Sequence, residues 1–173
     1  MRTLALLLII VAVPLAVTAT AAANTIQTEV VTVHDTFDFG EAAEACGFPV
    51  DIRVDGSFKV TDYFDNSGNL SKEIIAPVGG PFTVTAINPA NGKSTTTQAQ
   101  SFVSIVQFNP DGSVASASNS GPIYNFVVPG LGTILQSTGR LVFDSNSDII
   151  FVAGPNDFDT GNTAAFCNYL ADP

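Results

Sequence analysis

Apolar and polar residues alternate in short runs along most of this chain, and clusters of turn-forming residues separate the runs. In the segments 49–54 and 81–88, for example, every second residue is apolar. A period of two is typical of antiparallel strands that bury one face and leave the other in water. A helical period is confined to the short segments 41–46 and 163–170. The pattern therefore predicts an all-β fold.

The alternating runs predict a series of short strands. They lie at residues 49–54, 57–64, 70–76, 81–88, 94–108, 113–118, 122–128, 133–143 and 148–153. The clusters between them are rich in Asn, Asp, Gly and Pro, which form turns because Gly, Asn and Asp tolerate left-handed conformations and Pro fixes φ. The pairs 102–103 and 105–106, and the segment 126–128, place apolar residues on both faces of their strands. We expect these segments to be covered on both sides or to meet a partner.

The first 23 residues have the pattern of a signal peptide. Arg2 precedes the apolar run 4–17, and small residues ending at Ala23 follow it, which fits an A-x-A cleavage site. A membrane-spanning helix needs about 20 apolar residues, and this run is shorter. We therefore expect cleavage near Asn24, a secreted mature protein, and no membrane span after cleavage.

The two cysteines, Cys46 and Cys167, flank the main set of predicted strands. In an exported chain they are expected to form a disulfide. Because a disulfide needs Cα atoms within about 7 Å, the two ends of the strand set must meet, as they do in a closed meander. We therefore expect an antiparallel up-and-down β-barrel of about eight strands over residues 46–173, preceded by an arm or strand at 24–45. A β-sandwich is the alternative, since both architectures manage free strand edges.

Acidic residues dominate the charge of the chain. It carries 6 Lys and Arg residues against 16 Asp and Glu residues, a formal net charge of −10. Nucleic acids and anionic membrane surfaces require basic patches, so the composition argues against both as partners. Two cysteines and a single histidine do not make a standard four-ligand zinc site. We expect neither a metal nor a cofactor.

His34 is the single histidine, and four carboxylates follow it closely, those of Asp35, Asp38, Glu41 and Glu44. A histidine can act as a general base beside a nucleophile, or as a metal ligand beside carboxylates. No serine lies in a Gly-x-Ser-x-Gly elbow that would supply the nucleophile. We interpret His34 as an ordinary surface histidine, with the catalytic and metal-ligand roles as alternatives.

Three segments, 65–69, 144–148 and 156–162, are rich in oxygen-bearing side chains, as calcium loops are. The segment 144–148 lacks the glycine and the distal glutamate of an EF-hand loop. Asp, Asn and Gly also form ordinary hairpin turns. We interpret these segments as turns, with calcium binding as the alternative.

Asp62 and Arg140 are the predicted ligand-binding residues. Asp62 falls in register with the apolar residues Phe58, Val60 and Phe64, and Arg140 interrupts a strand that is otherwise free of charge. A lone buried charge is costly, so an inward carboxylate implies an inward partner. We therefore predict that Asp62 and Arg140 face the interior and lie close together. The alternative is a β-bulge that turns Asp62 outward, with Arg140 on the outer face.

Several short motifs resemble a known group of proteins. The segment 46–50 (CGFPV), the segment 108–113 (FNPDGS), the segment 138–143 (TGRLVF) and the late Cys167 resemble uncharacterised exported β proteins of actinomycete-type bacteria. This resemblance implies a secreted bacterial β protein and carries over no activity or catalytic residue. At the level of the fold, the pattern is also similar to small eight-stranded barrels such as lipocalins and allene oxide cyclases, which does not imply a function.

Three functions remain open at this point. The first is a binding module that holds an apolar small molecule or a component of the cell envelope in or on a β-barrel. The second is a structural or surface-interaction protein with a filled core. The third is an enzyme of the barrel isomerase or cyclase type, although the sequence contains no visible pair of nucleophile and base. An empty or a filled interior would separate the first two.

Overall fold

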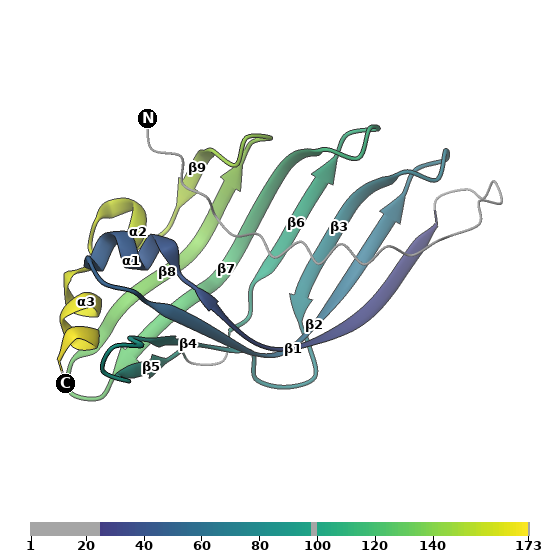
Figure 1. Cartoon of the computed structure of the whole chain (residues 1–173). Helices are drawn as coiled ribbons and strands as arrows, with labels where there is room; N and C mark the ends of the chain where they lie inside the picture. Colours follow the sequence, from purple (N-terminus) through teal and green to yellow (C-terminus); the bar gives the residue numbers. More distant parts are fainter. Residues whose placement is uncertain (1–24, 98–99, 173) are drawn as a thin grey trace.

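The structure of this chain, a computed structural model, describes residues 25–97 and 100–172. The segment expected to be a signal peptide, residues 1–23, lies outside the described residues. Within them, nine strands form one sheet whose pairings are all antiparallel (Figure 1), which confirms the all-β prediction. The strands are β1 (Ile26–Asp38), β2 (Asp51–Phe64), β3 (Leu70–Pro77), β4 (Thr83–Ile87), β5 (Ser94–Thr96), β6 (Val103–Phe108), β7 (Val114–Val128), β8 (Gly132–Phe143) and β9 (Ile149–Ala153).

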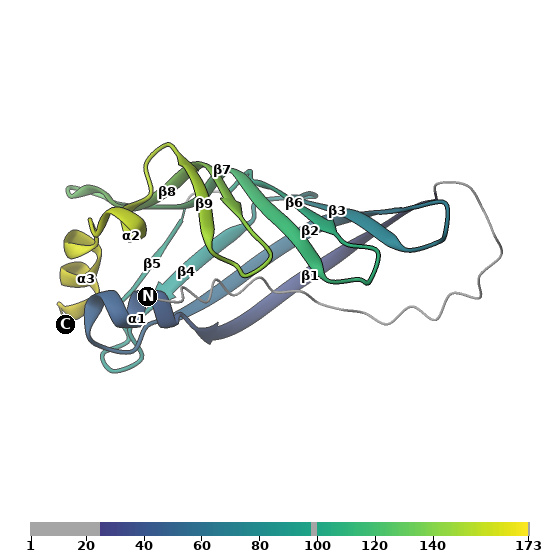
Figure 2. The ribbon, with the colours of Figure 1, turned by 90° about the horizontal axis from the view of Figure 1, so that it is seen from above.

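Short helices occupy both segments in which the sequence predicts a helical turn. These are α1 (Gly40–Cys46) and α3 (Ala164–Ala171), and α2 (Asp157–Thr160) adds one more turn between β9 and α3. All three lie together at one end of the sheet, as both views show (Figures 1 and 2). Among the described residues, no helix is long and apolar enough to cross a membrane.

The long strand β2 divides the sheet into two branches. Its first residues, Asp51–Asp55, pair with β4, and the later residues Phe58–Phe64 pair with β3 on the same edge. On its other edge, β2 pairs with β1 along its whole length, from Asp51 to Tyr63. From β3 the sheet continues through β6, β7 and β8 to β9. The β4 branch ends at β5, beyond which Thr97 forms an isolated bridge to Phe126 of β7.

The sheet does not close into the predicted barrel, and it is one sheet rather than the two of a sandwich. Among the described residues, β1 pairs with β2 alone and β9 with β8 alone, so both strands are edges. The curvature is concentrated at the end where β4 and β5 approach β7. There the three helices cover the space that further strands would occupy in a barrel, while the opposite end of the sheet spreads open (Figure 2).

Two predicted turns are wrong, because they lie inside long strands. The sequence 54–57 falls within β2, and 118–122 falls within β7. The glycines in these segments allow another chain segment to approach the strand closely rather than reverse its direction. At Gly121, which has a φ of 96°, a Cβ atom would lie 2.7 Å from the carbonyl oxygen of Ser101. Directly opposite, at Gly139 of β8, a Cβ atom would overlap the carbonyl oxygen of Ala153.

The buried side chains form two clusters. The main cluster lies under the helices and contains Phe39, Ala42, Val50, Ile52, Val54, Phe82, Val84, Ala86, Phe126, Ile134, Leu135, Phe166 and Leu170. The second cluster lies toward the open end and contains Val106, Ala117, Leu141 and Phe143. In β7 and β8, Gly121 and Gly139 lie between the residues of the two clusters. The side of the sheet that carries Val106 and Leu141 is called the inner face below.

The predicted disulfide between Cys46 and Cys167 is confirmed. It joins the end of α1 to α3, with the two Cα atoms 5.1 Å apart. The two cysteines therefore meet through the helices at the covered end of the sheet, without the neighbouring first and last strands on which the barrel prediction rested.

Candidate functional site

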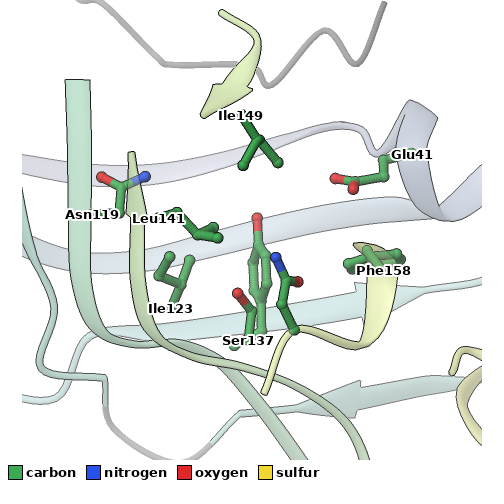
Figure 3. Close-up of a pocket in the computed structure, with 9 residues that line it drawn as sticks. Glu41, Asn119, Ile123, Ser137, Leu141, Ile149 and Phe158 are labelled. Carbon is green, nitrogen blue, oxygen red and sulfur yellow. The ribbon is translucent and has the colours of Figure 1, made fainter. Parts of the chain in front are cut away.

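A small cleft lies where α1 and α2 meet the inner face of the sheet (Figure 3). It is lined by Glu41, Asn119, Ile123, Tyr124, Ser137, Leu141, Ile149, Asn156 and Phe158. Its volume of about 40 Å³ is enough for a water molecule or for the end of an aliphatic chain. Pockets that enclose a whole small molecule are much larger, roughly 300–1,000 Å³. The cleft can therefore hold only part of a ligand.

A β-bulge places two successive residues of β7 in the cleft. The register between β7 and β8 shifts between Pro122 and Tyr124, which leaves Ile123 as the extra residue. In a regular strand, neighbouring residues face opposite sides of the sheet, so strict alternation would send one of Ile123 and Tyr124 to the outer face. The bulge explains why the sequence pattern did not indicate this site.

A buried carboxylate fixes α2 above the cleft. Asp157 is buried, and its side chain accepts hydrogen bonds from the backbone N–H of Gln136 at 2.7 Å and from the amide of Asn162 at 3.1 Å. These bonds offset the cost of removing a charged group from water. Next to it, Asn156 forms an isolated bridge to Ser137 of β8. The two contacts hold Phe158, which follows directly, at the rim of the cleft.

The acidity of Tyr124, which lines the cleft, is altered by its surroundings. Burial raises the pKa of the Tyr124 hydroxyl, and the carboxylate of Glu41 raises this pKa further. The hydroxyl therefore stays protonated at neutral pH and can donate a hydrogen bond. The ring packs against Phe39, with centroids 5.6 Å apart, and stacks on Phe126 at 6.3 Å. This packing makes Tyr124 a rigid part of the wall.

The predicted pair of Asp62 and Arg140 is wrong, because the two residues lie on opposite faces of the sheet. The register runs from Asp62 to Glu73, then to Val106 and to Ala117, all on the inner face. Arg140 pairs with Ser120, which is three residues from Ala117 and therefore points to the outer face. Arg140 is also exposed. The register of the strands therefore excludes a single polar site that contains both residues.

Asp62 lies beside other carboxylates instead. It is directly opposite Glu73 of β3, and Glu29 of β1 pairs with the neighbouring Val60. Burial is the first cause that raises the pKa values of Asp62 and Glu73, and repulsion by the adjacent carboxylates is the second. The Oδ1 atom of Asp62 is buried without a hydrogen-bond partner among the described residues. The sequence pattern indicated the inward direction of Asp62, but it did not reveal the two acidic neighbours.

These carboxylates border a second hollow near the β1 edge. It has a volume of about 170 Å³ and is lined by Gln27, Thr28, Glu29 and Asp62. Within the part of the chain that the structure describes, His, Cys, Asp and Glu side chains do not gather in threes or more in a way that could hold a metal ion. We therefore assign no ligand to this hollow.

His34 lies on the exposed edge strand β1 and pairs with a carboxylate across the strand. Its Nδ1 atom is 3.2 Å from Oδ1 of Asp55, whose other oxygen accepts a hydrogen bond from Arg53 at 2.9 Å. The hydrogen bond to His34 and then that to Arg53 lower the pKa of Asp55. Of the carboxylates that follow His34 in the sequence, Glu41 lines the cleft. The structure thus places His34 on the surface, within hydrogen-bonding distance of Asp55.

Hydrogen bonds to the backbone occupy the acidic turn residues that resembled calcium loops. Oδ1 of Asp144 accepts from the N–H groups of Asn146 at 2.8 Å and Asp148 at 3.0 Å. Oδ1 of Asp65 accepts from the N–H groups of Ser67 and Asn69 in the same way. These bonds are the local turn chemistry of aspartate, and they support the interpretation of both segments as turns.

The cleft is thus a small open space that apolar and polar groups from helices and strands surround. Comparison of the chain with protein-family models, with curated proteins and with solved structures finds no match.

Proposed function

We propose that this protein is an exported, non-catalytic binding module, and that it holds an apolar group of its ligand in the cleft between α1, α2 and the sheet. The apolar lining from Ile123, Leu141, Ile149 and Phe158 supports this proposal. A mostly apolar hollow with a few polar groups at its rim is the arrangement that ligand sites share. In this site the Tyr124 hydroxyl would supply the hydrogen bond that orients the ligand.

The size of the cleft limits the ligand. A volume of about 40 Å³ accommodates the last two or three carbons of an aliphatic chain, or one apolar side chain. Burial of each methylene group contributes about 0.8 kcal/mol, so the cleft alone supplies roughly 2 kcal/mol. The ligand must therefore gain further affinity outside the cleft, as a component of the cell envelope or an exported protein would.

Titration with 1-octanol tests the cleft directly. Amide signals of the ¹⁵N-labelled mature protein in 119–124 and 137–141 should shift and saturate, because these residues border the cleft. Replacement of Ile149 with Ser should weaken binding at least threefold. Val103→Ser is the matched control, since Val103 is an exposed apolar residue that pairs with Ser120 on the outer face. Shifts that do not saturate, or that centre away from the cleft, would reject the proposal.

A second candidate is a structural or surface-interaction protein with a filled core. The packing of phenylalanine rings under the helices favours it, since Phe126 and Phe166 are fully buried and their ring centroids lie 5.5 Å apart. In that case octanol would produce no saturable shift in a protein that melts cooperatively. Export itself is tested by mass spectrometry of protein recovered from the medium, where a first residue near Asn24 is expected.

A further inference from the structure

The edge strand β9 exposes three consecutive apolar residues and contains no charged residue. Its sequence is Ile-Ile-Phe-Val-Ala, and Ile150, Phe151 and Val152 are 62%, 49% and 45% exposed. One edge of β9 pairs with β8, and among the described residues its other edge has no strand partner. The backbone groups of that edge are therefore available to a further strand.

Free edges of this kind are normally protected. Proteins place charged residues, bulges or prolines on edge strands because an unguarded edge pairs with other chains. The opposite edge strand, β1, follows this rule with Glu29, His34, Asp35 and Asp38. In β9 the protection is limited to a bulge at Ile150, which leaves Phe151–Ala153 in regular register. The contrast between the two edges indicates that β9 is kept open for a partner.

The charges around β9 define the chemistry of that partner. Asp144 and Asp148 lie in the turn that precedes the strand, and Glu41 lines the cleft together with Ile149 (Figure 3). At the other end of β9, the last residue, Ala153, pairs with the basic residue Arg140, which points to the outer face. A second copy of this chain would bring the same acidic turn and a net charge of −10 to the contact. A partner with basic residues is electrostatically favoured instead.

We propose that β9 accepts an extended peptide segment as an added strand, and that the segment is apolar with basic residues at the end that meets Asp144 and Asp148. Backbone hydrogen bonds along β9 would supply affinity, as in other cases of strand addition. Ile149 belongs both to β9 and to the cleft. An inward side chain of the added strand would therefore enter the cleft, and in this respect the inference rests on the proposed function.

A synthetic peptide of alternating valine and threonine that ends in two lysines is a suitable probe. Its Kd, measured by fluorescence anisotropy of a labelled peptide in 50 mM salt, should be at least tenfold lower than that of the same peptide ending in two glutamates. The difference should shrink in 500 mM salt, because salt screens exposed charges. A proline in the middle of the peptide should abolish binding, because proline lacks the N–H group that pairing requires.

Variants locate the contact. Phe151→Lys should raise the Kd for the lysine peptide at least tenfold, and Phe151→Thr, which keeps β propensity and adds no charge, at least threefold. Ile26→Lys is the matched control, because Ile26 is 59% exposed on the opposite edge strand, and it should leave the Kd unchanged. Circular dichroism and thermal melts confirm that each variant folds.

Several results would overturn the inference. They are equal binding of the lysine and glutamate peptides, an unchanged Kd in both Phe151 variants, or a dimer in sedimentation equilibrium that Phe151→Thr dissociates. The last result would assign the edge to a second copy of the chain. Octanol binding without peptide binding would leave the proposed function intact and reject strand addition, whereas peptide binding without octanol binding would reject the cleft alone.

Discussion

Replacement of Glu73 with Gln should stabilise the protein at neutral pH. Asp62 and Glu73 are directly opposite one another on β2 and β3, and both side chains are partly buried on the inner face. Like charges at directly opposed positions destabilise a sheet by about 0.2–1 kcal/mol. For a domain of this size, that free energy corresponds to an increase of roughly 0.4–4 °C in Tm. The amide keeps the shape of the side chain and removes its charge.

The pH dependence follows from the direction of the pKa shifts. Burial first, and neighbouring carboxylates second, raise the pKa of Glu73 in the folded protein. A raised carboxyl pKa means that the folded state disfavours the ionised form. Glu73 therefore contributes stability only while it is protonated. This contribution is complete below the unfolded pKa of about 4.3, and it is lost as the pH rises through the folded pKa. The advantage of Glu73→Gln should therefore be largest near pH 7 and vanish near pH 3.

Thermal melts from pH 3 to pH 8, followed by circular dichroism, measure this difference. Asp62→Asn should act in the same direction, and the double variant should gain less than the sum, because either change removes the same repulsion. Asp111→Asn is a control that should have the opposite effect. Hydrogen bonds from Ser113 lower the pKa of Asp111, so loss of the Asp111 charge should destabilise the protein at pH 7. A gain for Glu73→Gln that is equal at pH 3 and pH 7 would refute the reasoning.

Three further predictions concern the fold. Replacement of Cys46 and Cys167 with Ala should cost about 4–5 kcal/mol in a urea titration, because the bridge spans 121 residues, and an unchanged midpoint would contradict the chain-entropy argument. Gly139→Ala should cost roughly 3 kcal/mol or more, since its Cβ would overlap a backbone oxygen, and normal expression with an unchanged Tm would show that the strands can separate there. Asp62→Asn and Arg140→Met should combine additively within about 0.5 kcal/mol, whereas a larger coupling energy would place the two side chains in contact.

The sequence pattern was sufficient to predict most strands, both helical turns and the disulfide, because each depends on local periodicity or on a single covalent pair. The sequence pattern failed where a glycine could either form a turn or allow another segment to approach a strand closely. The Asp-Gly at 55–56 and the Gly-Pro at 121–122 are typical of turns, and their role in β2 and β7 depends on which distant segment approaches them. That information is absent from a local window of sequence.

The candidate site was not predictable for a related reason. Tyr124 and Ile123 reach the cleft through a bulge, and α2 is positioned by a hydrogen bond from the distant Gln136 to Asp157. The pairing of Asp62 with Arg140 was inferred from opposite charge and from the apolar neighbours of each residue within its own strand. Whether the two share a face is set by the register across the four strand pairs that join β2 to β8. A shift of a single residue in any of these registers would have reversed the outcome.

The position of the disulfide also sets an order of events during synthesis. Cys46 leaves the ribosome 121 residues before Cys167, a delay of roughly 6–24 s at about 5–20 residues per second. Throughout that interval the first thiol has no partner, and the bond closes only after the final helix has been made. An interrupted chain would therefore carry an unpaired Cys46 thiol and lack the disulfide, so the bridge forms only in chains that extend into α3.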